Sequence, residues 1–349
     1  MSPASPIGVG VIGLGFMGRT HIGAYEAARR AGFDCKVVAA CDEREERLAG
    51  GGEARGNIET ATAASLAWSS IRTTTDPATL LGDDAVHLVS ICTPTDSHVD
   101  LAISALEAGK HVLVEKPVAL RAREVRRLAE AARRASTLCM PAMCMRFWPA
   151  WSWLRERMRG ADHGAVVSAV FQRIASVPDW APGFYSEPAR SGAALFDLHI
   201  HDVDFIHWCF GKPVEVVSAG SERHVTSLYR FEKGPPRVVA EGAWSPVPGF
   251  PLRMRALVMF EGAVADYELG RDPELLLMSD GKSEAVPLEP LSGYDGEVRH
   301  LLEAIARGRR HLDATIDEAE SVTRTLEAER ESLASARRVR LESSPSAGC

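Results

Sequence analysis

The feature that most constrains the fold is a glycine pattern near the start of the chain, in IGVGVIGLGFMGRTHIGAYEAARRAG. Residues 7–12 predict a short buried strand, and Gly13, Gly15 and Gly18 follow with G-x-G-x-x-G spacing before a helical stretch. The first glycine permits a tight turn, the second lets a pyrophosphate approach the backbone, and the third lets the helix pack closely. Because the helix start offers free N–H groups to phosphate, the pattern predicts a dinucleotide site, with Phe16 and Met17 among its contacts.

The next predicted strand, CKVVAACD, ends in an acid that bears on the choice of cofactor. Asp42 stands where a carboxylate accepts hydrogen bonds from the adenosine ribose. A negative charge there repels a 2′-phosphate, which favours NAD over NADP. Arg44 lies two residues on and softens this preference, so NADP stays the alternative and Arg44 is a further cofactor contact. A simple helix-capping role is the structural alternative for Asp42.

The strand–helix alternation continues through AVHLVSICTPTDSHVDLAISALEAGKHVLVEKP. Buried strands over 85–92 and 111–115 with short connections indicate a parallel, doubly wound sheet. Ligands on such sheets bind beyond the carboxyl ends of the strands. We therefore expect one crevice lined by strand-end residues and their neighbours, namely Gly13, Asp42, Thr93, Pro94, His98, Glu115 and Lys116. Residues 51–67 interrupt the pattern and are expected to form an exposed excursion.

Lys116 stands at the end of a predicted parallel strand and is therefore expected to point into the cofactor crevice. A lysine at a strand end suits holding or polarising a hydroxyl oxygen, because its ammonium is a compact donor with a tunable pKa. Pro117 ends the strand and fixes the turn, with a cis peptide bond as one way to do so. The alternative is a surface lysine that pairs with Glu115.

Length and composition bound the remaining choices. A chain of 349 residues predicts two domains, here divided at 1–144 and 145–349, with a C-terminal helix able to pack back on the first. The net charge of −7 argues against nucleic acid as a partner. The seven cysteines form no CxxC pair, which favours reduced thiols in a cytoplasmic protein without a metal site. The start resembles no signal peptide, and no apolar run approaches a membrane span.

The most informative stretch of the second half is SGAALFDLHIHDVDFIHWCFGKP, which predicts a helix that ends at Gly211. Residues turn by about 100° along a helix, so Asp197, His201 and Asp204 share one face and His199 lies opposite. This geometry argues against His199 and His201 as joint metal ligands. Seven short strands between 165 and 278 predict an open, mainly antiparallel sheet, and helices are expected over 294–307 and 316–337.

The glycine motif, CTPTDSH, EKP and DLHIHDVD occur here in an order that resembles the Gfo/Idh/MocA oxidoreductase family, which includes glucose-fructose oxidoreductase and inositol dehydrogenase. The resemblance spans most of the chain. It implies an α/β Rossmann domain followed by an α+β domain whose large antiparallel sheet carries the active site on one face. The other face is commonly buried between subunits, which implies a homodimer or homotetramer.

The resemblance also implies roles for particular residues. Lys116 would be catalytic or substrate-binding, and Glu115 would support the cofactor or the local structure. The family pattern Asp-x-x-x-His matches Asp197 and His201, with His201 as the acid/base residue and Asp197 as a substrate-binding or orienting group. Arg146 resembles an arginine that borders the active site. His199 replaces a small residue and is a weaker candidate for substrate contact, and Trp180 lies in a loop expected to shape the pocket.

The sequence therefore predicts an NAD(P)-dependent dehydrogenase or reductase that moves hydride between nicotinamide and a secondary alcohol of a sugar, sugar acid or cyclitol. Two alternatives stay open at this point. One is an NAD-dependent, redox-neutral glycosidase, and the other is a dinucleotide-binding regulator without catalysis. A metal-binding module built on HIHD is a third, which the helical geometry disfavours.

Overall fold

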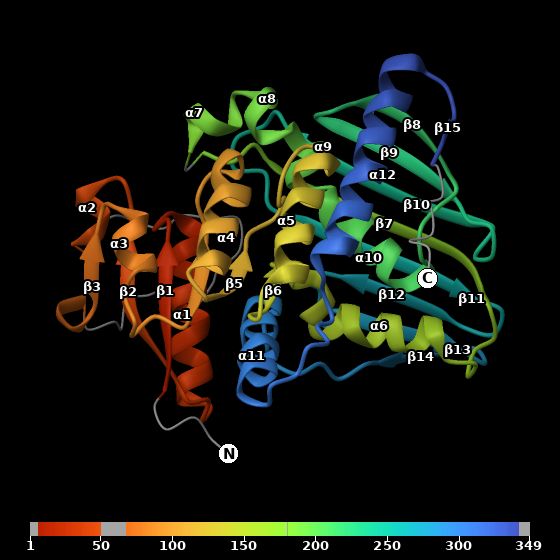
Figure 1. Ribbon diagram of the computed structural model, residues 1–349. Helices are drawn as coiled ribbons and strands as arrows, with labels where there is room; N and C mark the ends of the chain where they lie inside the picture. Colours follow the sequence, from red (N-terminus) through yellow and green to blue (C-terminus); the bar gives the residue numbers. More distant parts are fainter. Residues whose placement is uncertain (1–5, 50–67, 180, 342–349) are drawn as a thin grey trace. The chain divides into compact units, whose positions relative to one another are not determined.

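The computed structural model describes residues 6–49, 68–179 and 181–341, and it contains two compact units (Figure 1). The first unit comprises Met1–Trp148, Pro178–Phe184 and Leu291–Glu320, and the second comprises Pro149–Val177, Tyr185–Pro290 and Ser321–Cys349. The sequence-based division assigns all of 145–349 to one domain, whereas the structure assigns 145–148, 178–184 and 291–320 to the first unit.

The first unit contains a six-stranded sheet in the order β3-β2-β1-β4-β5-β6 with every pair parallel. Its strands are β1 (Ile7–Ile12), β2 (Cys35–Cys41), β3 (Arg72–Thr74), β4 (Leu88–Ile91), β5 (His111–Val114) and β6 (Cys139–Pro141). The central strands are runs of apolar residues because both faces of a parallel sheet are covered. The predicted doubly wound sheet is confirmed. Its order reverses between β1 and β4, which is where ligands bind in such sheets.

Helices connect these strands, and one helix from late in the sequence joins them. The connections are α1 (Phe16–Arg30), α2 (Glu45–Leu48), η2 (Trp68–Ser70), α3 (Pro77–Leu81), η3 (Thr95–Ser97), α4 (His98–Glu107) and α5 (Ala122–Arg134). The late helix, α11 (Gly293–Ala306), packs beside α1 and against η4 (Cys144–Phe147) (Figure 1). A Cβ on Gly293 would overlap the carbonyl oxygen of Cys144, and one on Gly296 would crowd Phe147. The two glycines therefore let α11 approach η4 closely.

The second unit contains a nine-stranded sheet in the order β14-β13-β12-β11-β7-β10-β9-β8-β15. Only β7 and β10 pair in parallel, so the predicted mainly antiparallel sheet is confirmed. The strands are β7 (Val166–Ser176), β8 (Glu215–Ser221), β9 (His224–Arg230), β10 (Arg237–Ser245), β11 (Arg253–Phe260), β12 (Val264–Glu268), β13 (Leu275–Ser279), β14 (Lys282–Ala285) and β15 (Val339–Arg340). Buried and exposed residues alternate along β9 and β11, so one face of the sheet is covered and the other is open within the chain.

The covered face packs against helices through an aromatic core. The remaining helices are α6 (Pro149–Arg159), α7 (Pro182–Tyr185), α8 (Pro188–Ser191), α9 (Ala193–Asp197), α10 (Ile200–Phe210) and α12 (Ile316–Ser335). Trp151 of α6 contacts Phe171, Phe205 and Tyr267, and its side chain is fully buried. Within the described ranges, every helix is too short or too polar to cross a membrane.

Candidate active site

The glycine loop after β1 has the geometry that its spacing predicts. Gly13 has φ +90°, and a Cβ there would lie 2.6 Å from the carbonyl oxygen of Cys92. A Cβ on Gly18 would overlap the carbonyl oxygen of Gly13, so only glycine lets α1 start this close to β1. At Gly15 the direction of a side chain is open to at least 4 Å. The loop thus leaves space where a pyrophosphate would approach, and its residues fit a dinucleotide.

The start of α1 adds electrostatic support. The helix begins at Phe16, and its first turn carries no acidic side chain within this described segment. Its leading N–H groups and its dipole therefore favour an anion at this end. Phe16 and Met17 are half-buried in this turn, and their contact with a cofactor stays a prediction.

The structure places Asp42 directly beside the glycine loop. One carboxylate oxygen, Oδ2, accepts a hydrogen bond from the backbone N–H of Leu14 at 2.7 Å, and Oδ1 accepts one from Arg44 at 3.0 Å. The guanidinium of Arg47 lies 3.3 Å from Oδ2. The Arg44 side chain is exposed and pairs with Glu46 at 2.8 Å. Asp42 therefore braces the loop and keeps its carboxylate at the carboxyl end of β2.

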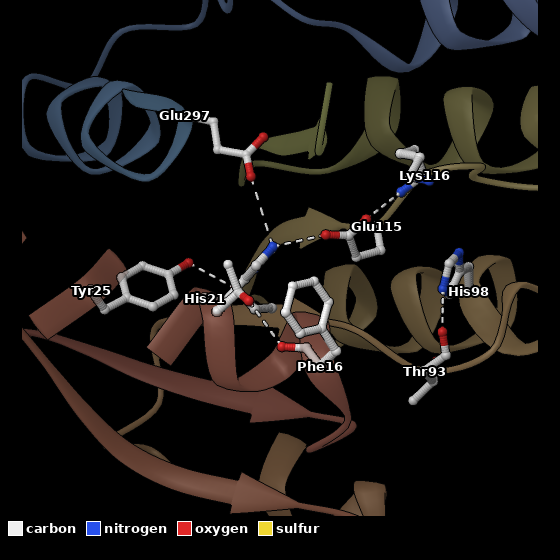
Figure 2. A network of polar contacts seen from close by, with 10 residues as sticks. Phe16, His21, Tyr25, Thr93, His98, Glu115, Lys116 and Glu297 are labelled. Carbon is white, nitrogen blue, oxygen red and sulfur yellow. Dashed lines mark hydrogen bonds and ion pairs between the residues drawn. The ribbon is translucent and has the colours of Figure 1, made fainter. Parts of the chain in front are cut away.

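His98 joins the loops that follow β4 and β5. Its Nε2 lies 2.8 Å from the carbonyl oxygen of Thr93 (Figure 2). Its Nδ1 lies 3.0 Å from the carbonyl oxygen of Pro117. The ring is 1% exposed. Burial lowers the pKa of His98, and the two carbonyl oxygens oppose this effect. His98 thus joins the loop that follows β4 to the loop that follows β5. Contacts of the cofactor with His98, Thr93 and Pro94 stay predictions.

Glu115 and Lys116 stand at the carboxyl end of β5. The Glu115 carboxylate is buried: Oε1 contacts His21 Nε2 at 2.9 Å, and Oε2 accepts a hydrogen bond from the Lys116 backbone N–H at 3.0 Å (Figure 2). The Lys116 side chain is half-buried, and the Lys116–Pro117 peptide bond is cis. Glu115 therefore orders the backbone of the lysine that follows it.

Two residues of this arrangement were not predicted from the sequence. His21 of α1 and Glu297 of α11 are fully buried, and their side chains lie 3.8 Å apart. A signal for each exists in the sequence, because both polar residues lie within apolar helical stripes. On the same helix face, His21 lies between Gly18 and Tyr25, and Glu297 is followed by Leu301, all of them buried.

In the second unit, the expected continuous helix through Asp197 and His201 is wrong. The segment forms α9, which ends at Asp197, and α10, which begins at Ile200. At the junction, the His199 N–H bonds the carbonyl oxygen of Ala194, five residues back rather than four. Asp197 and His201 are both half-buried, whereas His199 is fully buried.

The reason for the break lies in the environment of His199. Its Nε2 lies 3.0 Å from the Tyr229 hydroxyl and 3.1 Å from Glu329, and both partners are buried. A Cβ on Gly242 would lie 2.6 Å from the Cβ of His199, so the ring occupies space that the glycine leaves. The structure thus corrects the weaker expectation for His199, which packs inside the second unit instead of facing a substrate.

The remaining candidates have different outcomes. The side chain of Arg146 is 1% exposed, donates to the carbonyl oxygen of Asp313 at 2.6 Å and lies 3.0 Å from Glu318. These contacts hold the chain between α11 and α12, and a substrate contact by Arg146 stays a prediction. Trp180 lies outside the described residues. Among the residues with described positions, no group of three or more His, Cys, Asp or Glu side chains is arranged to hold a metal ion.

Comparisons with known proteins agree with this fold. A model described as an oxidoreductase family with an NAD-binding Rossmann fold matches residues 7–143, and a GFO/IDH/MocA C-terminal domain model matches residues 151–271. The solved structure of levoglucosan dehydrogenase with NADH and levoglucosan has a TM-score of 0.84 at 20% identity, covering 97% of this chain and 100% of that one. That likeness shows the fold.

Curated relatives match this chain over part of their length. The chain is 26% identical to scyllo-inositol 2-dehydrogenase (NAD(+)) of Bacillus subtilis (strain 168), over 69% of this chain and 74% of that protein. It is 31% identical to myo-inositol 2-dehydrogenase of Thermotoga maritima, over 60% of this chain and 57% of that protein. The match spans 38% to 58% of the length of several others. With both domain models matched in order, the chain belongs to the Gfo/Idh/MocA oxidoreductase family.

Proposed function

We propose that the protein is an NAD-dependent dehydrogenase that oxidises a secondary alcohol of a sugar, sugar acid or cyclitol. The observation that carries this proposal is the placement of Lys116 at the carboxyl end of β5, with only β4 between it and the glycine loop of β1. Two strand spacings amount to about 10 Å, which lies within the span of a dinucleotide. The relatives named as inositol and levoglucosan dehydrogenases support the substrate class.

The proposed chemistry divides between cofactor and protein. NAD, when bound, supplies the acceptor for the hydride of the alcohol carbon. His201 takes the hydroxyl proton, because an imidazole has a pKa close to neutral pH. Lys116 stabilises the developing alkoxide with its ammonium, and Asp197 orients His201 or holds a neighbouring hydroxyl. Lys116 belongs to the first unit and Asp197 and His201 to the second, so their meeting at one substrate is part of the proposal.

Replacing His201 with alanine tests this assignment. We expect kcat to fall by about 10²–10⁴-fold while the Kd for NAD stays unchanged, since the glycine loop is untouched. The assay is reduced-cofactor absorbance with a panel of sugars and cyclitols. His207→Ala is the matched control on the same helix, where the ring contacts Thr325 instead. Full turnover in the His201 variant would remove this residue from the mechanism.

The preference for NAD over NADP rests on the Asp42 carboxylate beside the glycine loop. Asp42→Asn keeps an acceptor for Leu14 and removes the negative charge. The ratio of kcat/KM for NAD to that for NADP should fall by at least about tenfold. Arg44→Ala, which changes an exposed residue paired with Glu46, should shift the ratio less. An unchanged ratio in the Asp42 variant would assign the preference elsewhere.

The open face of the nine-stranded sheet supports a homodimer or homotetramer. Val217, Leu228, Val239, Val170 and Leu257 are paired in register and form an apolar row across five neighbouring strands. Val217 and Leu228 are 38% and 46% exposed in the single chain. Such a row is typical of a covered surface. Light scattering of the purified protein tests this, and a monomer at assay concentration would contradict it.

A further inference from the structure

Three buried ionisable side chains lie close together next to Lys116, and the proposed chemistry makes no use of them. We call His21, Glu115 and Glu297 the proton cluster. They come from α1, from the end of β5 and from α11, all within the first unit (Figure 2). The Nε2 atom of His21 lies 2.9 Å from Glu115 Oε1 and 3.8 Å from Glu297 Oε1. Their side chains are 0%, 6% and 0% exposed.

The charges of the proton cluster do not balance if both acids are ionised. One imidazole presents a single Nε2 position to two carboxyl groups, and its Nδ1 faces the hydroxyl of Ser90 at 3.3 Å. In the part of the chain that the structure describes, neither oxygen of Glu297 has a hydrogen-bond partner. A buried carboxylate without donors is costly, so such a group takes up a proton.

The two acids have opposite environments. Burial raises the pKa of Glu297 well above its ordinary value, and the charge of Glu115 adds to this rise. Burial also acts to raise the pKa of Glu115, but His21, Lys116 and His98 outweigh it and the pKa is lowered. Pairs of acids whose pKa values are pushed apart in this way hold one proton between them.

The groups that surround Glu297 are consistent with this charge state. The titratable groups that interact with Glu297 are His21 and Tyr25 of α1, Cys92 after β4 and Glu115 after β5. Cys144 and Arg146 belong to η4, which packs against α11, and Asp295, Arg299 and His300 share the helix of Glu297. Burial raises the pKa of Cys92 well above its ordinary value, so its thiol stays neutral. Arg146 is engaged by Asp313 and Glu318.

We propose that Glu297 carries a proton in the working protein, and that its neutral state lets Glu115 hold the backbone of Lys116 in position. This proposal rests on the proposed function, because it makes Glu297 a positioning residue for the lysine of that reaction. When Glu297 releases its proton to solvent at high pH, the new carboxylate competes for the Nε2–H of His21 and repels Glu115. Glu115 then shifts, and its hydrogen bond to the Lys116 N–H is weakened.

Glu297→Gln is the sharpest variant for a test, because glutamine has the shape of the neutral acid and cannot ionise. Glu329→Gln, a buried glutamate of the second unit, is the matched control. The sequence has six lysines, so [¹⁵N]lysine labelling of the full chain gives six backbone amide signals. Comparison with Lys116→Arg assigns the signal of Lys116.

In the wild-type protein and in Glu329→Gln, the Lys116 amide signal should shift as pH rises, and kcat should fall with the same midpoint while KM stays constant. In Glu297→Gln, both changes should be absent. A Lys116 shift that persists in Glu297→Gln overturns the proposal, since titration of another group then moves the amide. If no polyol is oxidised by the wild-type protein, the proposed function fails while the amide titration still decides the positioning role.

A second measurement needs no variant. The infrared spectrum of the wild-type protein at neutral pH should contain the carbonyl band of a protonated carboxyl group, which disappears at the alkaline midpoint of the amide shift. A spectrum without this band at neutral pH overturns the proposal even if Glu297→Gln fails to fold.

Discussion

In each unit of the molecule, a buried histidine contacts a glutamate from a late helix. The two clusters differ in the second partner of the histidine, which is an acid in the first unit and a tyrosine in the second. In the first unit, His21 faces two acids, Glu115 and Glu297. In the second, His199 faces one acid, Glu329, and the hydroxyl of Tyr229 stands where a second acid would otherwise be. Tyr229 donates to Glu329 at 2.6 Å and lies 3.0 Å from His199.

The difference shows two ways in which a glutamate can be buried, either beside a hydrogen-bond donor or with a proton of its own. Glu329 accepts a hydrogen bond from the Tyr229 hydroxyl, and burial together with the charge of Glu329 raises the pKa of that tyrosine, so the hydroxyl keeps its proton. Within the described residues, Glu297 receives no donor and is compatible with burial only with a proton of its own. The second cluster is therefore suited to structure, and the first is able to respond to pH.

Removing each histidine should separate the clusters most strongly. His21→Ala leaves two buried acids facing each other, and we expect a loss of about 3–5 kcal/mol in the free energy of unfolding. His199→Ala leaves Glu329 bonded to Tyr229, so the loss should be about 1–3 kcal/mol. Urea unfolding of both variants measures the difference between the two losses. Equal losses would show that cavity formation, common to both changes, dominates over charge.

The pH dependence of stability should sharpen the contrast. The pKa of Glu297 is raised in the folded protein. Its contribution to the free energy of unfolding is therefore fully present below the ordinary carboxyl pKa, and it is lost as pH rises through the pKa of the folded protein. The free energy of unfolding should fall by about 1.4 kcal/mol per pH unit in that interval. Glu297→Gln should remove this slope, and Glu329→Gln should leave it in place. A slope that survives in Glu297→Gln would assign the titration to another group.

The smallest effect on the free energy of unfolding is expected for an exposed histidine–glutamate pair. His224 lies 2.8 Å from Glu241, with side chains 60% and 27% exposed. Because water screens such pairs, His224→Ala should change the free energy of unfolding by less than about 1 kcal/mol. The same urea experiment checks this value. A larger loss would mean that burial is not what distinguishes the two internal clusters.

Local patterns predicted most of the elements. The strand over 7–12 has the bounds that its apolar run predicts, and the helix expected over 316–337 begins at Ile316 and ends at Ser335. Short elements were missed, among them β3 and β14, because three or four mostly exposed residues carry little periodic signal. The break between α9 and α10 was missed for another reason. Its cause is a contact of His199 with residues distant in the sequence.

The sequence by itself determined the parallel sheet, the glycine loop and the strand-end positions of Asp42 and Lys116, because each depends on neighbours a few residues away. Only the tertiary structure decided which groups share a proton. Glu297 lies 182 positions after Glu115 in the numbering, and it reaches the cluster because α11 packs beside α1 in the first unit. The charge of a buried acid depends on the donors around it, and those donors come from whichever elements the fold brings together.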